Sequence, residues 1–319
     1  MRALITGAAG MYGFNLTRRL LGDDADASVV SVDDFSRHFP GGEPLTPELE
    51  AGRAIEIVRR DYAGLTTDEL NDWAPDVIVH FAARISVPES MERPHAYFAN
   101  NEAGTFRFAH AIAEMTRPPL LIYASSPEVY GPPVRVPMDE DHPLRPVTVY
   151  AVSKAACEMH CLALNRWWGH PVVVIRNFNT FGPHQNIVGY PAVTVAFARR
   201  ALRGEPLLLE NGGRQTRDFM FVDDAVDAYA RVMRKGAALA GSVFNIGTGR
   251  ETSILDVART VLAVTGSDSE IVETPGRRTD LPALRADATR IREATGWRPV
   301  TTFEDGMRRT VDWLRAVDR

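Results

Sequence analysis

A glycine-rich segment near the start of the chain constrains its fold more than any other feature. Gly7, Gly10 and Gly13 lie between an apolar, β-branched run (Ala3–Thr6) and a stretch of helical character (Tyr12–Leu21). Glycines permit a tight turn between a strand and a helix, and they let backbone N–H groups approach a phosphate at the helix N-terminus. The segment therefore predicts a strand–loop–helix unit that binds the diphosphate of a dinucleotide.

Short apolar runs alternate with helical stretches along the chain. This alternation predicts a parallel sheet covered by helices on both faces, which is the doubly wound α/β (Rossmann) fold. The expected strands are Ala3–Thr6, Val29–Val32, Ile55–Arg59, Val77–Phe81, Leu120–Ala124, Val172–Arg176 and, late in the chain, Ser242–Ile246. The expected helices are Tyr12–Leu21, Thr67–Trp73, Asn101–Met115, Ala151–Trp168, Ala192–Arg203, Asp223–Lys235, Ile254–Thr265 and Phe303–Ala316.

The second half of the chain has a different pattern of helices and loops. From Phe178 onward, loops rich in glycine and proline interrupt shorter helices. We therefore expect residues 1–178 to form a dinucleotide-binding domain, with about 218–248 returning to it. Residues 179–217 and 249–319 are expected to form a smaller, interleaved substrate domain at the C-terminal edge of the sheet.

The composition excludes several classes of protein. Of 319 residues, 45% are hydrophobic and 24% are charged, and 36 Lys and Arg against 41 Asp and Glu give a net charge of −5. Nucleic-acid binders normally carry a clustered basic excess. No stretch approaches the roughly 20 apolar residues that cross a bilayer, and the N-terminus lacks the pattern of a signal peptide. We therefore expect no nucleic-acid or membrane partner and a cytoplasmic location.

The helix expected at 151–168 carries both cysteines of the chain. Cys157 and Cys161 share one helix face, and no second pair of ligands follows at zinc-site spacing, so we expect buried thiols and no metal. Two cysteines are also too few for a disulfide framework. Trp167 and Trp168, just before Gly169, predict a helix end that packs on the core.

A carboxylate closes the second expected strand. Asp33 lies twenty residues beyond Gly13, where an acidic side chain accepts hydrogen bonds from the adenosine ribose. Because a carboxylate repels a 2′-phosphate, NAD is expected rather than NADP, although the nearby Arg37 would weaken this preference. The alternative for Asp33 is a turn or helix cap. Asp61 and Tyr62, just past the third strand, are expected to touch the adenine, and the alternative for Asp61 is a simple loop residue.

A phenol and an ammonium group share one face of the helix at 151–168. Tyr150 and Lys154 are four residues apart, a spacing that makes side chains neighbours on a helix. Tyrosine has a pKa of about 10, and both Lys154 and a bound nicotinamide cation are expected to lower it. Tyr150 could then remove a hydroxyl proton, with Ser126 holding the reacting oxygen. The alternatives are a solvated helix face for the pair and a turn cap for Ser126.

Taken together, these motifs resemble an extended short-chain dehydrogenase/reductase of the NAD-dependent nucleotide-sugar epimerase/dehydratase family, and in particular its UDP-glucose/galactose 4-epimerase-like members. The resemblance covers nearly the whole chain, and the joint order of the motifs is far more specific than any one of them. The matching segments, in chain order, are Thr6–Gly13, Asp33, His80–Ala83, Asn101–Thr105, Ser125–Gly131, Tyr150–Lys154, Arg176–Pro183, Gln215–Asp224 and Asn245–Gly247.

The resemblance implies NAD as the cofactor, a nucleotide-diphosphate sugar as the substrate, and a homodimer formed through the helices Asn101–Met115 and Ala151–Trp168. Ser126, Tyr150 and Lys154 would form a proton relay beside the nicotinamide, and Asn101 would support the active-site helix. The implied cofactor-binding residues are Gly7, Gly10, Met11, Tyr12, Gly13, Asp33, Asp61, Tyr62, Phe81, Ala82, Ala83, Asn101, Tyr150 and Lys154. The implied substrate-binding residues are Ser86, Ser126, Asn179, Arg217, Arg277 and Asp280.

Within the implied substrate site, Arg217 and Arg277 would grip the diphosphate together with Asn179, because converging arginines make charge-assisted contacts with phosphate. An ion pair with a neighbouring aspartate (Asp218 or Asp223) is the alternative for Arg217. Arg278 competes with Arg277 for the second position.

The segment after Ser126 bears on the reaction. Members of this family oxidise C4 of the sugar with transient formation of NADH and then diverge. Glu128 stands where dehydratases and decarboxylases carry a glutamate, whereas Pro127 stands where sugar dehydratases often carry an aspartate that acts as an acid. Because proline has no proton to donate, we favour a nucleotide-sugar 4-epimerase. The alternatives are a 4,6- or 5,6-dehydratase or a decarboxylase with Glu128 as catalytic base, and, more remotely, a non-catalytic dinucleotide sensor.

Overall fold

A parallel sheet of seven strands forms the centre of the molecule, whose computed structural model describes residues 1–36, 54–275 and 281–318. The strands are β1 (Arg2–Thr6), β2 (Ser28–Asp33), β3 (Ala54–Arg59), β4 (Val77–His80), β5 (Leu120–Ser125), β6 (Val172–Asn177) and β11 (Val243–Ile246). They lie in the order β11-β6-β5-β4-β1-β2-β3, and all neighbours are parallel. The predicted doubly wound α/β fold is confirmed, including its late strand. The strand order reverses between β1 and β4, where such sheets bind their ligands.

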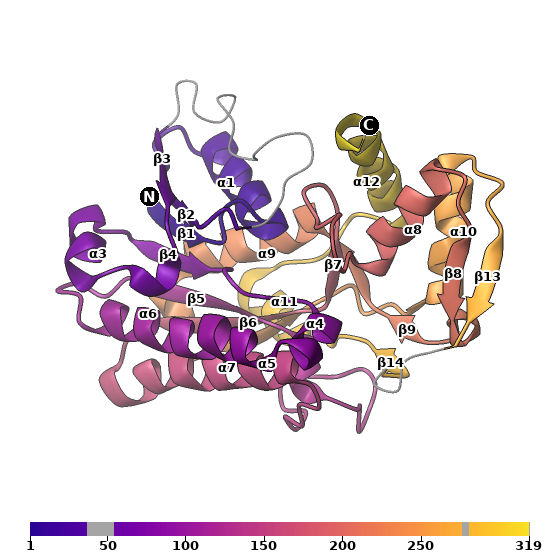
Figure 1. Ribbon diagram of the computed structural model, residues 1–319. Coiled ribbons are helices and arrows are strands. Elements are labelled where there is room, and N and C mark those ends of the chain that lie inside the picture. The colour runs from indigo at the N-terminus through magenta and orange to yellow at the C-terminus, as the bar shows by residue number, and fades with distance from the viewer. Residues whose placement is uncertain (37–53, 276–280, 319) are drawn as a thin grey trace.

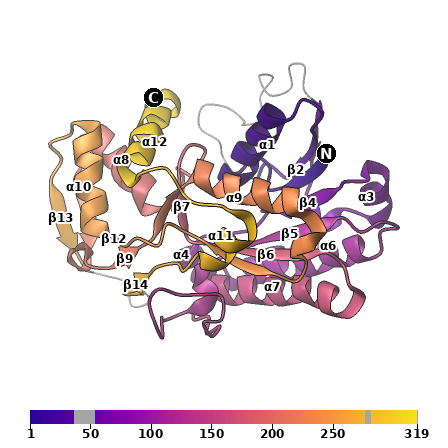
Figure 2. The same cartoon turned by 180° about the vertical axis from the view of Figure 1, so that it is seen from behind.

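Helices cover both faces of this sheet because successive side chains of a strand point to opposite sides. Ala3 and Ile5 belong to one apolar cluster, and Leu4 belongs to the other. The first cluster lies under α1 (Met11–Asp23) and α9 (Val222–Lys235), which pack side by side (Figures 1 and 2). The second lies under α3 (Thr67–Trp73), α6 (Gly104–Ala113) and α7 (Val149–Trp168).

A second group of elements lies to one side of the sheet, on the right of Figure 1. It contains α8 (Val193–Leu202), α10 (Ile254–Thr265), α12 (Phe303–Val317), and a parallel pair, β8 (Leu207–Glu210) with β13 (Ile271–Thr274). Short strands join this group to the sheet: β7 (Asn179–Phe181) pairs with β10 (Phe219–Phe221), and β9 (Thr216–Arg217) lies between β12 (Thr252–Ser253) and β14 (Ala283–Leu284). One further helix, α11 (Thr289–Thr295), packs on β11 and α9.

Short elements are the main departure from the predicted string of helices and strands. The helix expected to begin at Asn101 is preceded by a π-helical turn, η2 (Phe98–Ala103), and by α4 (Val87–Glu92) and α5 (Pro94–Tyr97). Elements this short carry too few residues to show a hydrophobic period. The remaining short helical turns are η1 (Tyr62–Gly64), η3 (Pro127–Tyr130), η4 (Asn211–Gly213) and η5 (Gly236–Leu239).

The long helix α7 confirms one prediction and corrects another. Cys157 and Cys161 are free and fully buried, as expected. Trp167 and Trp168 do not pack on the core: 80% and 54% of their surfaces are exposed. The helix ends at Gly169, whose φ is 70°, so both indoles lie in its last, solvent-exposed turn. Across the three described ranges, no helix has the length and apolar character needed to cross a membrane.

Candidate active site

The glycine-rich turn joins β1 to α1 at the point where the strand order reverses. Gly7 has a φ of +66°, and a side chain there would come within 2.7 Å of the Ala82 backbone nitrogen. A side chain at Gly13 would overlap the backbone of Gly7 and Ala8. No side chain caps α1 at Gly10, so its first N–H groups are left for an anionic ligand. This cradle fits the diphosphate of NAD.

Asp33 closes β2 directly beside the turn. Its carboxylate accepts hydrogen bonds from the Ala9 N–H at 3.0 Å and from the Phe35 N–H at 2.9 Å. The group is therefore fixed at the edge of the cradle and half-buried, as a ribose-binding carboxylate should be. Arg37, which the sequence offered as a competing influence, lies outside the described residues.

Asp61 and Tyr62, although adjacent in the chain, have different structural roles. Asp61 caps η1 by accepting from the Ala63 N–H at 2.9 Å. The Tyr62 ring is buried between His80 and Phe108, and its hydroxyl donates to a backbone carbonyl of η2. Asp61 is exposed and stays a predicted adenine contact, whereas the Tyr62 phenol belongs to the core.

Three aromatic rings form a wall beside the turn. Tyr12 stacks on Phe81 with ring centroids 5.3 Å apart and planes 17° apart, and Tyr229 meets both rings edge-on. The Tyr12 phenol hydrogen-bonds the Thr180 side chain, and burial raises its pKa. The Tyr229 phenol pairs with the Asn177 side chain at 2.9 and 3.0 Å. Tyr229 is fully buried, whereas Tyr12 and Phe81 are half-buried and form the outer part of this wall.

Ser126, Tyr150 and Lys154 meet at the C-terminal end of β5. Ser126 follows that strand and begins η3, where its hydroxyl accepts from the Glu128 N–H at 3.3 Å. Tyr150 lies in the first turn of α7, which Thr148 caps, and its phenol hydrogen-bonds the Ser126 side chain. Lys154 is one helical turn further on. These three of the four predicted catalytic residues are buried, and the fourth, Glu128, is half-buried.

The electrostatics of this trio differ from the expectation in one respect. Burial, opposed by the Ser126 hydrogen bond and assisted by the nearby charge of Glu128, raises the pKa of Tyr150 to about 12. Lys154 does not lower it: its ammonium lies 4.6 Å from the centre of the Tyr123 ring, and burial lowers its own pKa to about 8. The site alone therefore holds Tyr150 as a neutral phenol, and a proton-accepting state requires added positive charge.

Asn101 ties the active-site helix to the loop after β4. Its side-chain carbonyl accepts from the Arg84 N–H at 2.8 Å, and its amide donates to the Arg84 carbonyl at 3.0 Å and to the Ser153 hydroxyl at 2.9 Å. The Ser153 hydroxyl donates in turn to the Tyr150 carbonyl at 2.8 Å. Asn101 therefore positions Tyr150, as the resemblance implies.

A buried ion pair supports the floor of the site. Glu158 on α7 and Arg176 on β6 are 1% and 4% exposed and hydrogen-bond each other twice. Glu158 also accepts from the Ser125 hydroxyl at 2.9 Å, and Arg176 donates to the Tyr130 hydroxyl at 2.8 Å. The pair thus fixes α7, β5 and β6 on both sides of Ser126.

The structure describes four of the six predicted substrate-binding residues, Ser126 and the three that follow. Asn179 begins β7, and its side-chain oxygen is buried without a hydrogen-bond partner among the described residues. Arg217 on β9 donates to the Thr216 and Leu281 carbonyls, both at 2.8 Å. Ser86 caps α4 through the Glu89 N–H at 3.2 Å. Arg277 and Asp280 lie outside the described residues, as does Arg278.

The two acids offered as alternative partners of Arg217 are bonded elsewhere. Asp218 is fully buried and accepts from the backbone N–H groups of Thr248, Gly249 and Ala286 at 2.8 to 3.1 Å. Asp223 pairs with Arg309 at 2.5 Å. Both carboxylates thus have other partners, and the diphosphate contact of Arg217 stays a prediction.

Two tyrosines near the site were not predicted from the sequence. Tyr229 arrives from α9, far along the chain, and Tyr97 arrives from α5. The Tyr97 hydroxyl accepts from the Ser86 N–H at 2.9 Å, and its ring meets Tyr150 edge-on at 6.5 Å. Neither residue lies in a recognisable motif, so only the tertiary structure reveals them.

Comparisons with known proteins agree with this geometry. Residues 3–247 match the family described as "NAD dependent epimerase/dehydratase family". The chain is 35% identical to UDP-glucose 4-epimerase of Mycolicibacterium smegmatis over 99% of both chains. It is 30% identical to UDP-N-acetyl-alpha-D-glucosaminuronate decarboxylase of Bacillus cytotoxicus over 99% of this chain and 98% of that one. The crystal structure of UDP-glucose 4-epimerase from Thermotoga maritima with UDP-glucose is similar with a TM-score of 0.89 and 28% identity, covering 100% of both chains.

Proposed function

The chain belongs to the NAD-dependent epimerase/dehydratase family, as its motifs predict, and we propose that it is a nucleotide-sugar 4-epimerase. NAD is its cofactor. We assign a UDP-hexose as the substrate because similar proteins include the UDP-glucose 4-epimerases of two bacteria. A UDP-sugar decarboxylase is also similar over the whole chain, so the choice of reaction depends on the residues of the site.

Pro127 is the observation that carries the choice of epimerisation. Elimination of water requires an acid that protonates the departing hydroxyl as well as a base that removes a proton from carbon. Pro127 is buried between Ser126 and Glu128 and has no proton to give. Epimerisation requires only the exchange of one hydroxyl proton, which the Tyr150 phenol can perform.

The residues of the chain divide the work as follows. Ser126 and Tyr150 hydrogen-bond the C4 oxygen of the sugar, and Tyr150 takes its proton. NAD, when bound, would supply hydride transfer to and from C4 and a positive nicotinamide charge that lowers the pKa of Tyr150. Lys154 adds positive charge to the floor of the site. Asn179 and Arg217 hold the diphosphate, which leaves the sugar ring able to turn before Tyr150 returns the proton.

A dehydratase or decarboxylase is the second candidate, and Glu128 favours it. Glu128 is half-buried and close enough to Tyr150 for its charge to raise the pKa of that phenol. A carboxylate beside a 4-keto sugar can remove the acidified C5 proton. In an elimination of water, Glu128 would have to serve as both base and acid, because Pro127 cannot donate a proton to the departing hydroxyl.

The test is incubation of the NAD-loaded enzyme with UDP-glucose, UDP-galactose, UDP-N-acetylglucosamine or UDP-glucuronic acid, followed by proton NMR of the products. We expect one sugar to convert to a mixture with its C4 epimer, and the same mixture to form from either side. Release of carbon dioxide or formation of a 6-deoxy sugar contradicts epimerisation. Tyr150→Phe is the matched control that should show no conversion.

We also propose a homodimer formed through α6 and α7. These neighbouring helices expose apolar side chains, among them Phe106 (44%), Val152 (46%) and Met159 (56%), and apolar patches on a protein surface mark interaction sites. The chain has a mass of 35.2 kDa, so sedimentation should give twice this value. Phe106→Glu with Met159→Glu should yield monomers, whereas Val300→Glu, at an exposed position elsewhere, should not.

We further assign the enzyme to the cytoplasm. Both cysteines are free and buried, an arrangement that suits a reducing compartment. Cell fractionation with an antibody against the chain tests this assignment, and recovery outside the cytoplasmic fraction contradicts it.

A further inference from the structure

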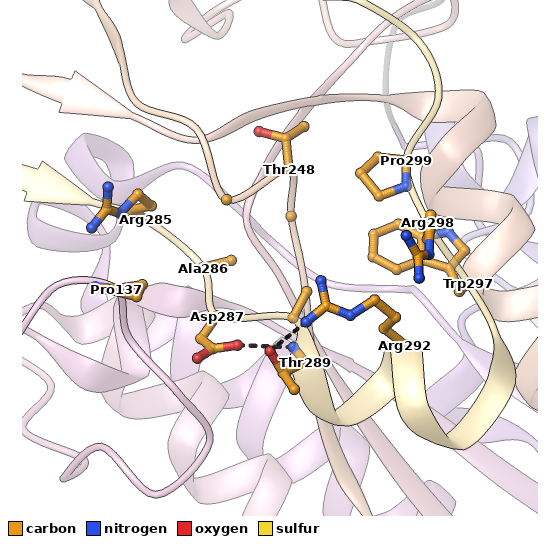
Figure 3. Close-up of a pocket in the computed structure, with 13 residues that line it drawn as sticks. Pro137, Thr248, Arg285, Ala286, Asp287, Thr289, Arg292, Trp297, Arg298 and Pro299 are labelled. Atoms are coloured by element: carbon orange, nitrogen blue, oxygen red, sulfur yellow. Dashed lines mark hydrogen bonds between the residues drawn. The ribbon is translucent and has the colours of Figure 1, made fainter.

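A second cavity lies apart from the catalytic trio, between the loop after β11 and the segment after β14 (Figure 3). Its volume is about 460 Å³, which is within the range of small-molecule sites, about 300–1,000 Å³. Three arginines and one aspartate line it, so its lining carries a formal charge of +2, while the whole chain carries −5. Positive charge concentrated in a hollow of an acidic protein points to an anionic ligand.

The three arginines come from separate segments. Arg285 lies on one side of the cavity, and Arg292 and Arg298 lie on the other (Figure 3). The Arg285 Nε is buried and has no hydrogen-bond partner among the described residues, and its nearest acid is Glu251 at 3.8 Å. Arg298 makes no hydrogen bond or ion pair with any residue that the structure describes. These guanidinium groups retain donors for a ligand.

The remaining lining explains which anion fits. The Thr289 side chain hydrogen-bonds Asp287 and lowers its pKa, assisted by the Thr289 N–H, which donates to the Asp287 carboxylate at 2.9 Å. Arg292 donates to the Thr289 hydroxyl at 2.7 Å. Trp297 is 1% exposed, and its indole donates to the Asp224 carbonyl, so it offers no open ring face to a nucleobase. Guanidinium groups on opposite sides of a cavity suit a multiply charged phosphate, which they bind in bidentate fashion.

A buried carboxylate, next in the chain to the proposed substrate residue Arg217, fixes part of the cavity lining. Asp218 binds the N–H groups of Thr248, Gly249 and Ala286, all of which line the cavity. Arg217, the next residue, donates instead to the Leu281 carbonyl. The proposed substrate site and the cavity therefore involve the neighbouring residues Arg217 and Asp218 but use different arginines.

We propose that this cavity is a second anion-binding site, which takes a small molecule bearing a diphosphate group through Arg285, Arg292 and Arg298.

The test measures ligand binding through the fluorine NMR signal of Trp297. The NAD-loaded enzyme is labelled with 5-fluorotryptophan, the Trp297 signal is assigned with Trp297→Phe, and inorganic pyrophosphate is titrated at constant ionic strength. We expect a saturable shift of the signal with half-saturation below about 1 mM. Arg292→Gln and Arg298→Gln, both at exposed positions, should each weaken binding about tenfold or more. Arg217→Gln and Arg234→Gln are matched charge controls and should leave the titration unchanged.

Each outcome decides the proposal. No saturable shift, or an unchanged shift in the double variant Arg292→Gln/Arg298→Gln, overturns it. Loss of the shift in Arg217→Gln also overturns it, because the signal would then report the substrate site. Sulfate that binds as tightly as pyrophosphate overturns the assignment to a diphosphate. Parallel titration with UDP identifies the source: tighter binding than pyrophosphate supports a nucleotide, and equal binding supports the diphosphate group alone.

Discussion

The side-chain amide of Asn101 lies 2.9 Å from the Ser153 hydroxyl, which donates to the backbone carbonyl of Tyr150. A residue of the π-helical turn before α6 thus sets the position of the proposed proton carrier on α7. Asn101→Ala would leave the Arg84 backbone groups and Ser153 without their partner. We expect a loss of about 1–3 kcal/mol in unfolding free energy and a lower kcat, measured by urea denaturation and steady-state kinetics. Ser153→Ala, which keeps both contacts to Arg84, should cost less, and an unchanged denaturation midpoint in Asn101→Ala contradicts the positioning role.

Removal of the Tyr150 hydroxyl tests the proton carrier. Tyr150→Phe preserves the ring and its edge-on contact with Tyr97 but cannot exchange a proton. We expect turnover to fall by about 10²- to 10⁴-fold, with the NAD content of the purified protein unchanged, as measured by absorbance after denaturation. Near-normal turnover would refute the assigned base.

Asp33 predicts which dinucleotide the enzyme binds. Its carboxylate is fixed by the Ala9 and Phe35 N–H groups and would face a 2′-phosphate at close range. We expect calorimetry to show preference for NAD over NADP on the order of 100-fold, given the size of like-charge repulsion near a protein surface. Asp33→Asn should narrow this ratio and Asp34→Asn should not. Equal binding of NAD and NADP by the unaltered enzyme would overturn the assignment.

Buried His80 predicts a pH dependence of stability. Its ring lies between the Thr6 and Thr105 hydroxyls at 2.6 and 3.0 Å, and burial lowers its pKa from 6.5 to about 3. Below pH 6.5 the unfolded chain therefore binds a proton that the folded chain does not. Stability from this group is complete above pH 6.5 and should fall by about 1.4 kcal/mol per pH unit as the pH decreases toward 3. His80→Asn should reduce this slope in urea denaturation between pH 6 and pH 4.5, and identical slopes would contradict the assignment.

Glu128 separates the two proposed reactions. If the enzyme is an epimerase, Glu128→Gln should keep most of its turnover, because the reaction needs no base at C5. The charge of Glu128 raises the pKa of Tyr150. Its loss should therefore lower that pKa and shift the pH–activity profile toward lower pH. A loss of turnover comparable to that of Tyr150→Phe would instead identify Glu128 as the working base of an elimination or decarboxylation.

Residues whose roles are local were predictable from the sequence. The glycine turn and Asp33 lie at the ends of strands. The ends of strands can be predicted from apolar runs and the turn residues that follow them. Tyr150 and Lys154 are likewise related by one helical turn. The parallel order of the strands then brings them to one edge of the sheet, so the fold class and the core of the site follow from pattern alone.

Other features depend on packing between distant segments. Tyr229 joins the aromatic wall from α9, and no spacing rule connects it to Tyr12. The raised pKa of Tyr150 comes mainly from burial, whereas the sequence suggested a lowered pKa from Lys154 and a bound nicotinamide cation. Trp167 and Trp168 were expected on the core because they precede Gly169 at a helix end, but both are exposed.

The most direct test of 4-epimerisation is the mass of the product formed from a nucleotide sugar by the NAD-loaded enzyme in heavy water. Internal return of hydrogen to C4, with Tyr150 exchanging only the hydroxyl proton, predicts a product of the same mass as the substrate with no carbon-bound deuterium. A product lighter by one water or one carbon dioxide, or one carrying deuterium at C5 or C6, would contradict this account and assign the chemistry to Glu128.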